Sequence, residues 1–216
     1  MSLSYIPAPP AARALKAPSE PQIEVAGQPA AFAKDQEIFG EGEAALHIFK
    51  VRSGAVRTFR VLSDGRRQIA DFYLPGDVFG VEAGVERSCS AEALTDTVVT
   101  VASRARLAED EADTARALWR LAIKDLHRSH EHVLTLGRRN ALERVASFLT
   151  DIAERMGAED DIALPMTRQD MADYLGLTIE TVSRTLSQLQ ASGVIRVGAG
   201  RALHVCDRSA LSVLCD

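Results

Sequence analysis

Residues 166–197 read MTRQDMADYLGLTIETVSRTLSQLQASGVIRV, and this stretch predicts two short helices joined by a tight turn. Thr167 is placed to cap a first helix over residues 168–175, because a threonine hydroxyl accepts a hydrogen bond from the free N–H groups of a first turn. Gly176 permits the sharp turn, and Thr178 is placed to cap a second helix. The stretch therefore predicts a helix-turn-helix unit.

The second predicted helix has an apolar face and a polar face. Four apolar side chains recur at helical spacing and are expected to pack against the first helix: Ile179, Val182, Leu186 and Leu189. Four polar side chains then face away: Glu180, Ser183, Arg184 and Ser187. Arginine pairs with O6 and N7 of guanine, glutamate accepts from N4 of cytosine, and serine suits either role. We expect Glu180, Ser183 and Arg184 to read base edges in DNA; the alternative is an ordinary solvated helix surface.

A β-hairpin is expected directly after this helix. Gly193 is placed to end the helix, and residues 194–197 and 202–206 alternate apolar and polar side chains around a turn at residues 198–200. The unit is therefore predicted to be a winged helix. Contacts to the DNA backbone are expected from Thr167, Arg168, Thr178, Ser187, Arg196 and Arg201. The alternative for the hairpin arginines is a solubilising edge.

Composition and charge limit the class of protein. The chain of 216 residues has room for two modest domains, and its net charge of −5 is unfavourable for a DNA-binding protein, whose affinity depends largely on phosphate contacts. Positive charge must therefore be placed locally. Neither a signal peptide nor a membrane span is indicated, so we expect a cytoplasmic protein. Its cysteines, Cys89, Cys206 and Cys215, are too scattered to hold a metal or iron-sulfur cluster by local spacing.

The chain is predicted to be an α+β protein of four segments. Residues 1–30 are rich in proline and form a flexible arm. Residues 31–108 contain short alternating runs between glycine turns, which are typical of a β jelly roll. Residues 109–138 form one long helix, and residues 139–216 form the winged helix-turn-helix domain. Within the last segment, residues 156–165 (MGAEDDIALP) are expected to be a polar loop.

The long helix carries a narrow apolar stripe: Ala115, Leu118, Ala122, Leu126 and Val133. A stripe this narrow, on a helix longer than its domain needs, favours pairing with the same helix of a second subunit. The alternative is packing on its own β domain. We favour a homodimer, because a helix-turn-helix protein commonly reads two half-sites related by two-fold symmetry.

In this order of segments the chain resembles the CRP/FNR superfamily of bacterial transcription regulators. The resemblance depends on YLPGDVFG at residues 73–80 and on TRQDMADYLGLTIETVSRTL at residues 167–186. The pattern E-x-x-S-R at Glu180, Ser183 and Arg184 is similar to the FNR and FixK branch. This resemblance implies a TTGA-type inverted repeat, with Arg184 at a guanine, Glu180 at the complementary strand and Ser183 at a thymine edge.

The β segment departs from relatives that carry a cofactor or bind a ligand. FNR proteins hold an iron-sulfur cluster through N-terminal cysteines, and no cysteine precedes Cys89 here. Cyclic-nucleotide binders use a glycine-glutamate pair and an arginine-serine pair, of which this chain has an eroded form around Glu82 and at Arg87 and Ser88. These last two are a weak candidate for an anion site, with a surface loop as the alternative. His47 or His130 could ligate haem, although structural roles are more common. No cofactor is predicted.

The sequence thus predicts a homodimeric activator of the FixK type, and the resemblance implies genes for low-oxygen respiration, nitrogen fixation or denitrification. Contact with RNA polymerase is expected at two turns that should be exposed beside the DNA. The loop over residues 157–164 carries Glu159, Asp160 and Asp161, and the β-roll turn over residues 64–67 carries Asp64 and Arg66. One alternative is a regulator gated by a small-molecule effector. An enzyme with an appended DNA-binding domain is disfavoured, because the sequence contains no nucleophile-base arrangement, metal-ligand cluster or phosphate loop.

Overall fold

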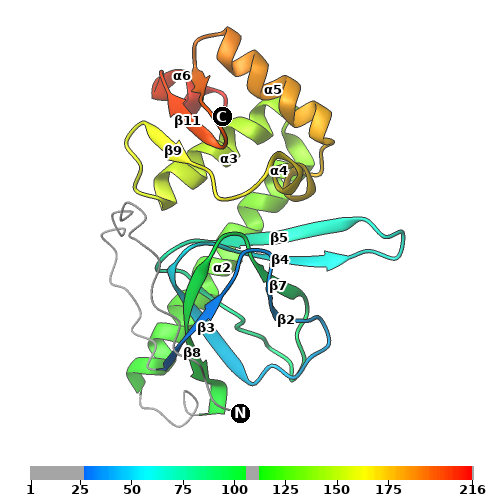
Figure 1. The fold of residues 1–216 in the computed structure, drawn as a ribbon, viewed down its shortest axis with the longest axis vertical. Coiled ribbons are helices and arrows are strands. Elements are labelled where there is room, and N and C mark those ends of the chain that lie inside the picture. The colour runs from blue at the N-terminus through cyan, green and yellow to red at the C-terminus, as the bar shows by residue number, and fades with distance from the viewer. Residues whose placement is uncertain (1–26, 106–111, 216) are drawn as a thin grey trace.

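The computed structural model describes residues 27–105 and 112–215, and these form a β-rich lobe and a mainly helical lobe joined by one long helix (Figure 1). The β-rich lobe is built from two antiparallel sheets of four strands, in the orders β1-β8-β3-β6 and β2-β7-β4-β5. Its strands are β1 (Gln28–Phe32), β2 (Glu37–Phe39), β3 (His47–Ser53), β4 (Val56–Val61), β5 (Arg67–Tyr73), β6 (Val78–Phe79), β7 (Ser90–Ala93) and β8 (Thr97–Ser103).

The two sheets enclose a core of aromatic and β-branched side chains. The rings of Phe49 and Phe79 stack with centroids 5.1 Å apart, and Phe39 lies 5.5 Å from Phe49. Val51 and Val99 fill the space beside them. Because alternate residues of each strand point inward, the alternation in the sequence builds this core. The predicted jelly-roll-like β domain is thereby confirmed.

One boundary expected from the sequence is wrong. Strand β1 begins at Gln28, which pairs with Val101 of β8, so residues 28–30 belong to the sheet and not to a mobile arm. Pairing with a strand about seventy positions away is not visible in local composition. The remainder of the expected arm, residues 1–26, lies outside the described residues.

Helix α2 (Ala112–Arg138) runs along the β-rich lobe and into the helical lobe. Leu121 is its buried residue against the sheet and packs with Ile48, Val78 and Ala102. The opposite side of α2 carries exposed apolar side chains, described below. The first residues of the expected helix, 109–111, lie outside the described part of the chain.

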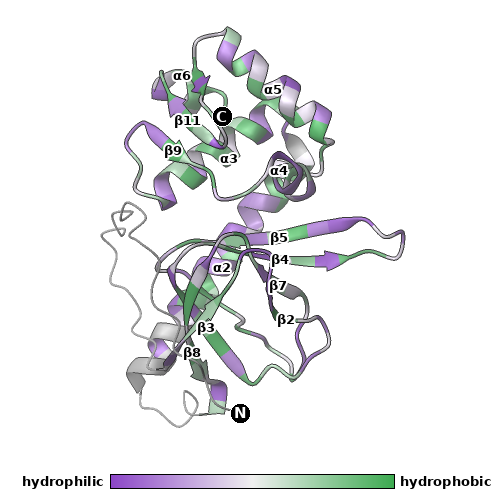
Figure 2. Ribbon diagram, in the orientation of Figure 1, coloured by the Kyte–Doolittle hydropathy of each residue, from purple (hydrophilic) through white to green (hydrophobic). Residues whose placement is uncertain are grey.

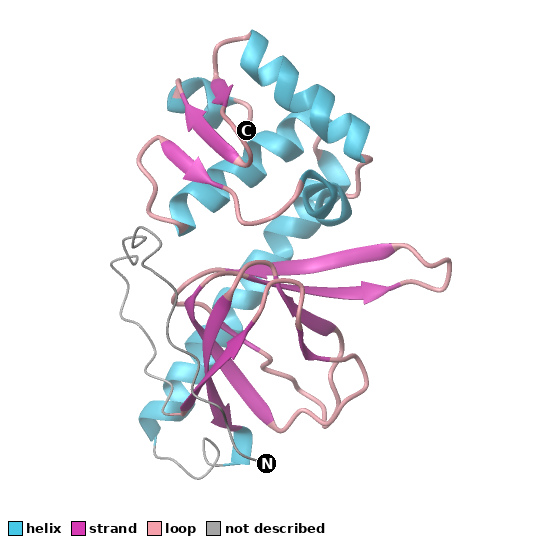
Figure 3. Ribbon diagram, viewed as in Figure 1, coloured by secondary structure: helices cyan, strands magenta, loops and turns pink. Residues whose placement is uncertain are grey.

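The helical lobe contains a small sheet as well as helices (Figure 3). Its helices are α3 (Ala141–Arg155), α4 (Arg168–Leu175), α5 (Ile179–Ala191) and α6 (Arg208–Val213), and its strands are β9 (Asp161–Ala163), β10 (Ile195–Val197) and β11 (Ala202–Val205). Asn140 begins α3 with a capping box, in which Glu143 completes the reciprocal hydrogen bond. Apolar residues are concentrated on the inner sides of these elements (Figure 2).

The prediction of a polar loop over residues 156–165 is wrong in part. Residues 161–163 form β9, which pairs with β11 through Leu203 and Ile162. Ile162 is 1% exposed and Leu164 is 8% exposed, so this segment contributes to the core of the helical lobe. Two apolar residues two positions apart are too short a pattern to distinguish a strand from a loop, and the partner strand lies about forty residues further on.

Candidate nucleic-acid interface

The two helices of the helix-turn-helix begin and end where the sequence predicts. Thr167 caps α4 by accepting a hydrogen bond from the N–H of Asp170, whose carboxylate accepts in return from the N–H of Thr167. Gly176 adopts a left-handed conformation with φ 62° and ends α4. Thr178 caps α5 by accepting from the N–H of Thr181 at 3.2 Å. The turn is therefore fixed by short-range hydrogen bonds and one glycine.

The inner face of α5 holds it on α4, with one correction. Val182, Leu186 and Leu189 are buried, and so is Thr185, which the apolar pattern does not reveal. Ile179 is expected in the core but is 37% exposed. Side chains lean toward the N-terminal end of a helix, so the side chain of this first residue of α5 lies beyond the helix end rather than over α4.

The outer face of α5 carries four polar side chains, of which the two charged ones are not engaged with other described residues. Glu180 and Arg184 are exposed, and neither makes a hydrogen bond or ion pair with another described residue. Ser183, half-buried between them, accepts a hydrogen bond from Arg168 of α4 at 3.3 Å. Ser187 donates to the main-chain carbonyl of Ser183. A guanidinium, a carboxylate and a hydroxyl thus share one solvent-facing helix surface.

The structure places α5 so that this face is open. Helix α5 runs along the outer edge of the helical lobe, and α4 lies between it and the β4–β5 hairpin (Figure 1). The inner face packs in the lobe's own core, whereas among the described residues the outer face contacts α4 only through the hydrogen bond from Arg168 to Ser183.

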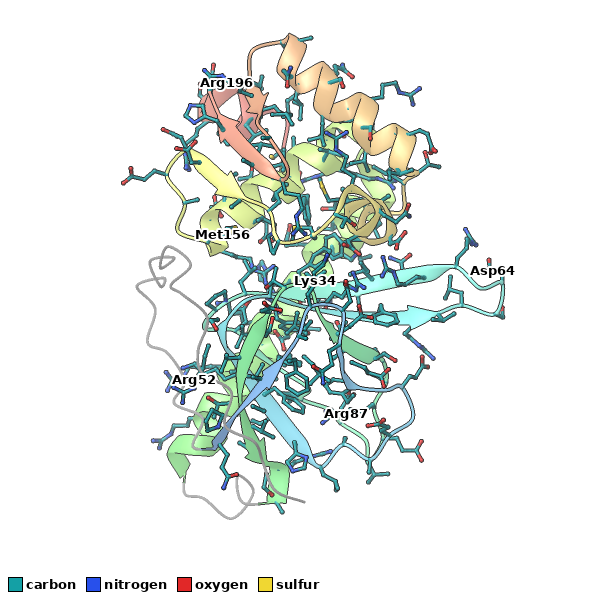
Figure 4. The ribbon with its side chains drawn as sticks, viewed as in Figure 1. Lys34, Arg52, Asp64, Arg87, Met156 and Arg196 are labelled. Atoms are coloured by element: carbon teal, nitrogen blue, oxygen red, sulfur yellow. The ribbon has the colours of Figure 1, made fainter. Side chains whose placement is uncertain are left out.

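The expected hairpin after α5 is present as β10 and β11, so the unit is a winged helix-turn-helix. Gly193, with φ 75°, follows the end of α5, and Val194 donates back to Leu189 at 3.0 Å. Arg196 on β10 points away from the lobe and is exposed (Figure 4). Arg201 instead donates to the carbonyl of Pro165, so it braces the connection to α4.

The acidic residues expected to be exposed lie near the wing and at the hairpin tip. Glu159, Asp160 and Asp161 are exposed; Asp160 pairs with Arg208 at 3.1 Å, and Asp161 lies 2.8 Å from His204. At the other site, Asp64 lies at the tip of the β4–β5 hairpin and pairs with Arg66 at 2.7 Å (Figure 4).

The stripe expected on α2 is exposed where the structure describes it. Leu126 is 52% exposed and Val133 is 65% exposed, and Ala122 is exposed as well. The side chains of Ala115 and Leu118 lie outside the described residues. Sequence reasoning missed three further exposed apolar residues on the same helix: Trp119, Ile123 and Leu134. Trp119 lies seven positions and Ile123 three positions before Leu126, so both continue the same stripe, and Leu134 lies beside Val133.

The region that corresponds to a cyclic-nucleotide site is filled by the protein itself. Arg87 is 4% exposed, and its guanidinium donates to the carbonyls of Gly80 at 2.7 Å and His47 at 2.6 Å. It lies 4.1 Å from the centre of the Phe39 ring, and burial lowers its pKa. Arg87 lies in the loop between β6 and β7, as one of the two alternatives had it, but its side chain is buried and hydrogen-bonded to the protein, which does not favour an anion site. Ser88 donates to Glu82 at 3.2 Å.

Other groups considered for cofactors stand apart. His47 and His130 are both exposed, and the described residues contain no group of three or more histidine, cysteine or acidic side chains that could hold a metal ion. The three cysteines are unpaired. In the same ranges, no helix has the length and apolar character needed to cross a bilayer.

Sequence reasoning also missed the contacts between the lobes. Asp170 is 1% exposed and pairs with Arg57 of β4 at 2.8 Å and Arg67 of β5 at 2.7 Å. The spacing of Thr167 and Asp170 could have revealed the capping box, but no local signal identifies arginines about one hundred residues earlier as partners.

Comparisons with known proteins find two domain families and several relatives that resemble this chain. Residues 143–214 match the Crp-like helix-turn-helix domain, and residues 29–109 match the cyclic nucleotide-binding domain. The chain is 45% identical over 197 residues to the nitrogen fixation regulation protein FixK of Azorhizobium caulinodans, covering 88% of this chain and 79% of that protein. It is 42% identical over 187 residues to FixK of Rhizobium meliloti, with 87% of each chain covered.

A solved structure agrees over nearly the same length. The structure of FixK2 from Bradyrhizobium japonicum matches with a TM-score of 0.84 at 44% identity, covering 88% of this chain and 98% of that chain. The match includes both the β-rich lobe and the winged helix-turn-helix, so the arrangement of elements is shared as well as the sequence. The chain therefore belongs to the FixK-like branch of the CRP/FNR superfamily, whose members are DNA-binding transcription regulators and not enzymes.

Proposed function

We propose that this protein is a cytoplasmic, homodimeric transcription activator that binds a TTGA-type inverted repeat. The observation that carries the proposal is the outer face of α5, where Glu180 and Arg184 are exposed and unengaged among the described residues. Relatives at 42% and 45% identity are named nitrogen fixation regulation proteins, and this supports genes of nitrogen fixation as targets. Genes of low-oxygen respiration or denitrification are proposed from the resemblance of the sequence alone.

Base reading is assigned to three side chains of α5. Arg184 can donate two hydrogen bonds to O6 and N7 of a guanine, and Glu180 can accept from a cytosine N4 on the complementary strand. Ser183 suits a thymine edge, and its hydrogen bond from Arg168 supports a shared position for the two side chains. Each correct contact of this kind discriminates by roughly 1–3 kcal/mol.

Contacts to the phosphates are assigned to five groups around this face: Thr167, Arg168, Thr178, Ser187 and Arg196. The caps place free N–H groups at the starts of α4 and α5, where the positive end of each helix favours an anion. Arg196 is exposed on β10, where its guanidinium can contact a DNA phosphate. Arg201 supports binding indirectly, because its hydrogen bond to Pro165 holds the wing against the start of α4.

Dimerisation is assigned to α2. At about 100° per residue, five exposed apolar side chains of this helix fall within an arc of about 100°. They are Trp119, Ile123, Leu126, Val133 and Leu134, and their exposed fractions range from 46% to 68%. Leu121, which packs on the sheet, lies on the other side of the helix. An apolar surface of this extent on a helix is typical of a subunit interface, and a second copy of α2 is its occupant in this proposal.

Contact with RNA polymerase is assigned to two exposed charged sites. One contains Glu159, Asp160 and Asp161 at the start of β9, and the other contains Asp64 and Arg66 at the tip of the β4–β5 hairpin. Both carry charge on turns that leave the main body of the protein, which suits an electrostatic contact with a large partner.

The proposal is tested by selecting bound fragments from random duplex DNA with the purified full chain and no added small molecule. We expect an inverted repeat with TTGA-type half-sites to be enriched, with a strong decrease in affinity as salt is raised. The proposal fails if the selected sequences contain no palindrome and the protein binds them no better than scrambled competitor at physiological ionic strength. A palindrome that is selected only after a nucleotide is added would instead indicate a regulator gated by an effector.

A further inference from the structure

An ion-pair cluster joins the β4–β5 hairpin to the first helix of the helix-turn-helix. It consists of Arg57 and Arg67 from the hairpin and Asp170 and Asp173 from α4, and we call it the interlobe cluster. Arg67 contacts both acidic residues at 2.7 Å, and Arg57 contacts Asp170 at 2.8 Å. Gln68 adds a hydrogen bond to the main-chain carbonyl of Asp173 at 2.8 Å.

The carboxylate of Asp170 serves both lobes at once. Its Oδ2 atom accepts from the N–H and hydroxyl of Thr167, at 2.9 Å and 2.7 Å, and this completes the cap of α4. Its Oδ1 atom accepts from Arg57 and Arg67. The same group that begins the helix-turn-helix is therefore the group that the β-rich lobe holds.

Burial of Asp170 and Arg57 restricts the geometry that this contact can adopt. The Asp170 side chain is 1% exposed and that of Arg57 is 10% exposed. A buried charge without its partners is strongly unfavourable, so the cluster stabilises the one arrangement of β5 and α4 in which both guanidiniums reach Oδ1. Exposed ion pairs tolerate many geometries and would not impose such a restriction.

A second set of contacts joins the lobes at a distance from the interlobe cluster. At the far end of β5, Arg155 of α3 pairs with Asp77 at 2.9 Å and donates to the carbonyl of Phe72. Arg128 of α2 pairs with Asp71 at 2.7 Å. Strand β5 is therefore held at both of its ends, and the contacts at its Arg67 end are the ones made with α4.

The orientation matters for recognition because α4 packs against α5. A dimer reads two half-sites whose centres are separated by about one helical turn of DNA, roughly 34–36 Å, so the direction of α5 relative to the dimer helix determines which separation is accepted. We propose that Arg57 and Arg67 are positioning residues for DNA recognition, which set the half-site spacing that the dimer accepts. This inference rests on the proposed function, since it requires a dimer that reads two half-sites.

The test compares half-site spacings with the full-length protein. The probes are duplexes that carry the selected inverted repeat with its spacer lengthened or shortened by one or two base pairs, and one duplex with a single half-site. Wild type is expected to prefer one spacing. Arg67→Gln is expected to bind the preferred spacing about tenfold more weakly, as for the loss of one charged hydrogen-bonded pair. Its affinities for the different spacings should become nearly equal, while single half-site binding is unchanged.

Two matched variants sharpen the test. Arg67→Lys keeps the charge but cannot contact two carboxylates with the fork of a guanidinium, so it should restore the spacing preference in part. Arg60→Gln removes an arginine of the same hairpin that pairs with Glu41 inside the β-rich lobe, and it should leave the spacing profile unchanged.

The outcomes separate this inference from the proposed function. A wild-type protein that ignores inverted repeats contradicts the proposed function itself. A specific wild type with an unchanged spacing profile in Arg67→Gln overturns the positioning role, and so does an equal loss on every duplex including the single half-site. If Arg67→Gln does not fold, Asp173→Asn removes the second partner of Arg67 and leaves the cap of α4 in place. A partly flattened profile is then expected, because the contacts with Asp170 remain, and a wild-type profile would overturn the inference.

Discussion

Replacing Leu126 by glutamate is expected to separate the proposed dimer. Five apolar side chains of α2 are exposed by 46–68% in the single chain. Full burial of such a side chain stabilises by about 1.5–3 kcal/mol, so covering half of each contributes about 1 kcal/mol, and ten of them in a dimer contribute about 10 kcal/mol. Association costs roughly 4–15 kcal/mol, so the interface has little surplus.

The substitution acts twice in a symmetric dimer. It removes about 2 kcal/mol of apolar burial, and it places two carboxylates at the interface, where desolvation and mutual repulsion add at least about 2 kcal/mol. A total near 4 kcal/mol raises the dissociation constant of the dimer about a thousandfold. A surplus of about 6 kcal/mol corresponds to a dissociation constant of roughly 40 μM for wild type. At several hundred micromolar protein, sedimentation equilibrium should therefore give a mass near the 23.4 kDa of one chain for Leu126→Glu and approach twice that for wild type.

The control is a glutamate at an equally exposed apolar position elsewhere. Val213 on α6 is 72% exposed and lies far along the chain from α2, so Val213→Glu should leave the mass of the assembly unchanged. An unchanged dimer mass for Leu126→Glu would refute the assignment of α2 as the interface. A mass near one chain for both variants would show that added negative charge, and not the interface, decides assembly.

Three further predictions concern specificity, pH and backbone strain. In a filter-binding assay, Arg184→Ala should weaken binding to the selected repeat by about 10- to 100-fold and leave binding to random DNA unaffected. Arg196→Ala should weaken binding to both DNAs alike and reduce the slope of log affinity against log salt by about 1. Equal losses on both DNAs for Arg184→Ala would contradict base reading. Burial raises the pKa of Asp71 to about 6, so the folded state binds this proton more readily than the unfolded state. The free energy of unfolding of wild type, relative to that of Asp71→Asn, should therefore increase by about 1 kcal/mol as pH falls from 7 to 5. Parallel urea-unfolding midpoints over that range would exclude the effect. Gly80→Ala should lower the melting temperature more than Gly65→Ala, because both glycines have a positive φ but only at Gly80 would a Cβ lie 2.8 Å from Arg87; equal shifts would contradict that role for the arginine.

The parts of the fold that the sequence predicts are those fixed by local chemistry. The caps at Thr167 and Thr178 and the turn at Gly176 each depend on residues within four positions, so the sequence contains the complete signal. The outer face of α5 follows from the same periodicity that buries Val182 and Leu186. The candidate base-reading residues could therefore be named before the structure.

The parts that it does not predict depend on partners far along the chain. Strand β9 is stabilised by pairing with β11. Arg87 is buried because its guanidinium packs over the ring of Phe39 on β2 and donates to the main-chain carbonyl of His47 on β3. A motif comparison finds Arg87 where a ligand-binding arginine would lie, but only its surroundings show that its hydrogen bonds go to the protein. Residue type at a position is thus weaker evidence for binding than the hydrogen bonds that the residue makes.

The net charge of −5 does not describe the charge at the outer face of α5. Several acidic residues, among them Asp71 and Asp170, lie between the lobes and are paired there with arginines, so their charges are largely cancelled over a few ångströms. Arg184 and Arg196, in contrast, are exposed and form no ion pair with a described residue. Charges that are paired at close range contribute little field at a distance, and screening at physiological salt limits the rest to about 8 Å. A phosphate at the outer face of α5 therefore meets the unpaired arginines and not the sum over the chain, which makes the local arrangement of charge, and not the net value, the quantity that decides whether this protein binds DNA.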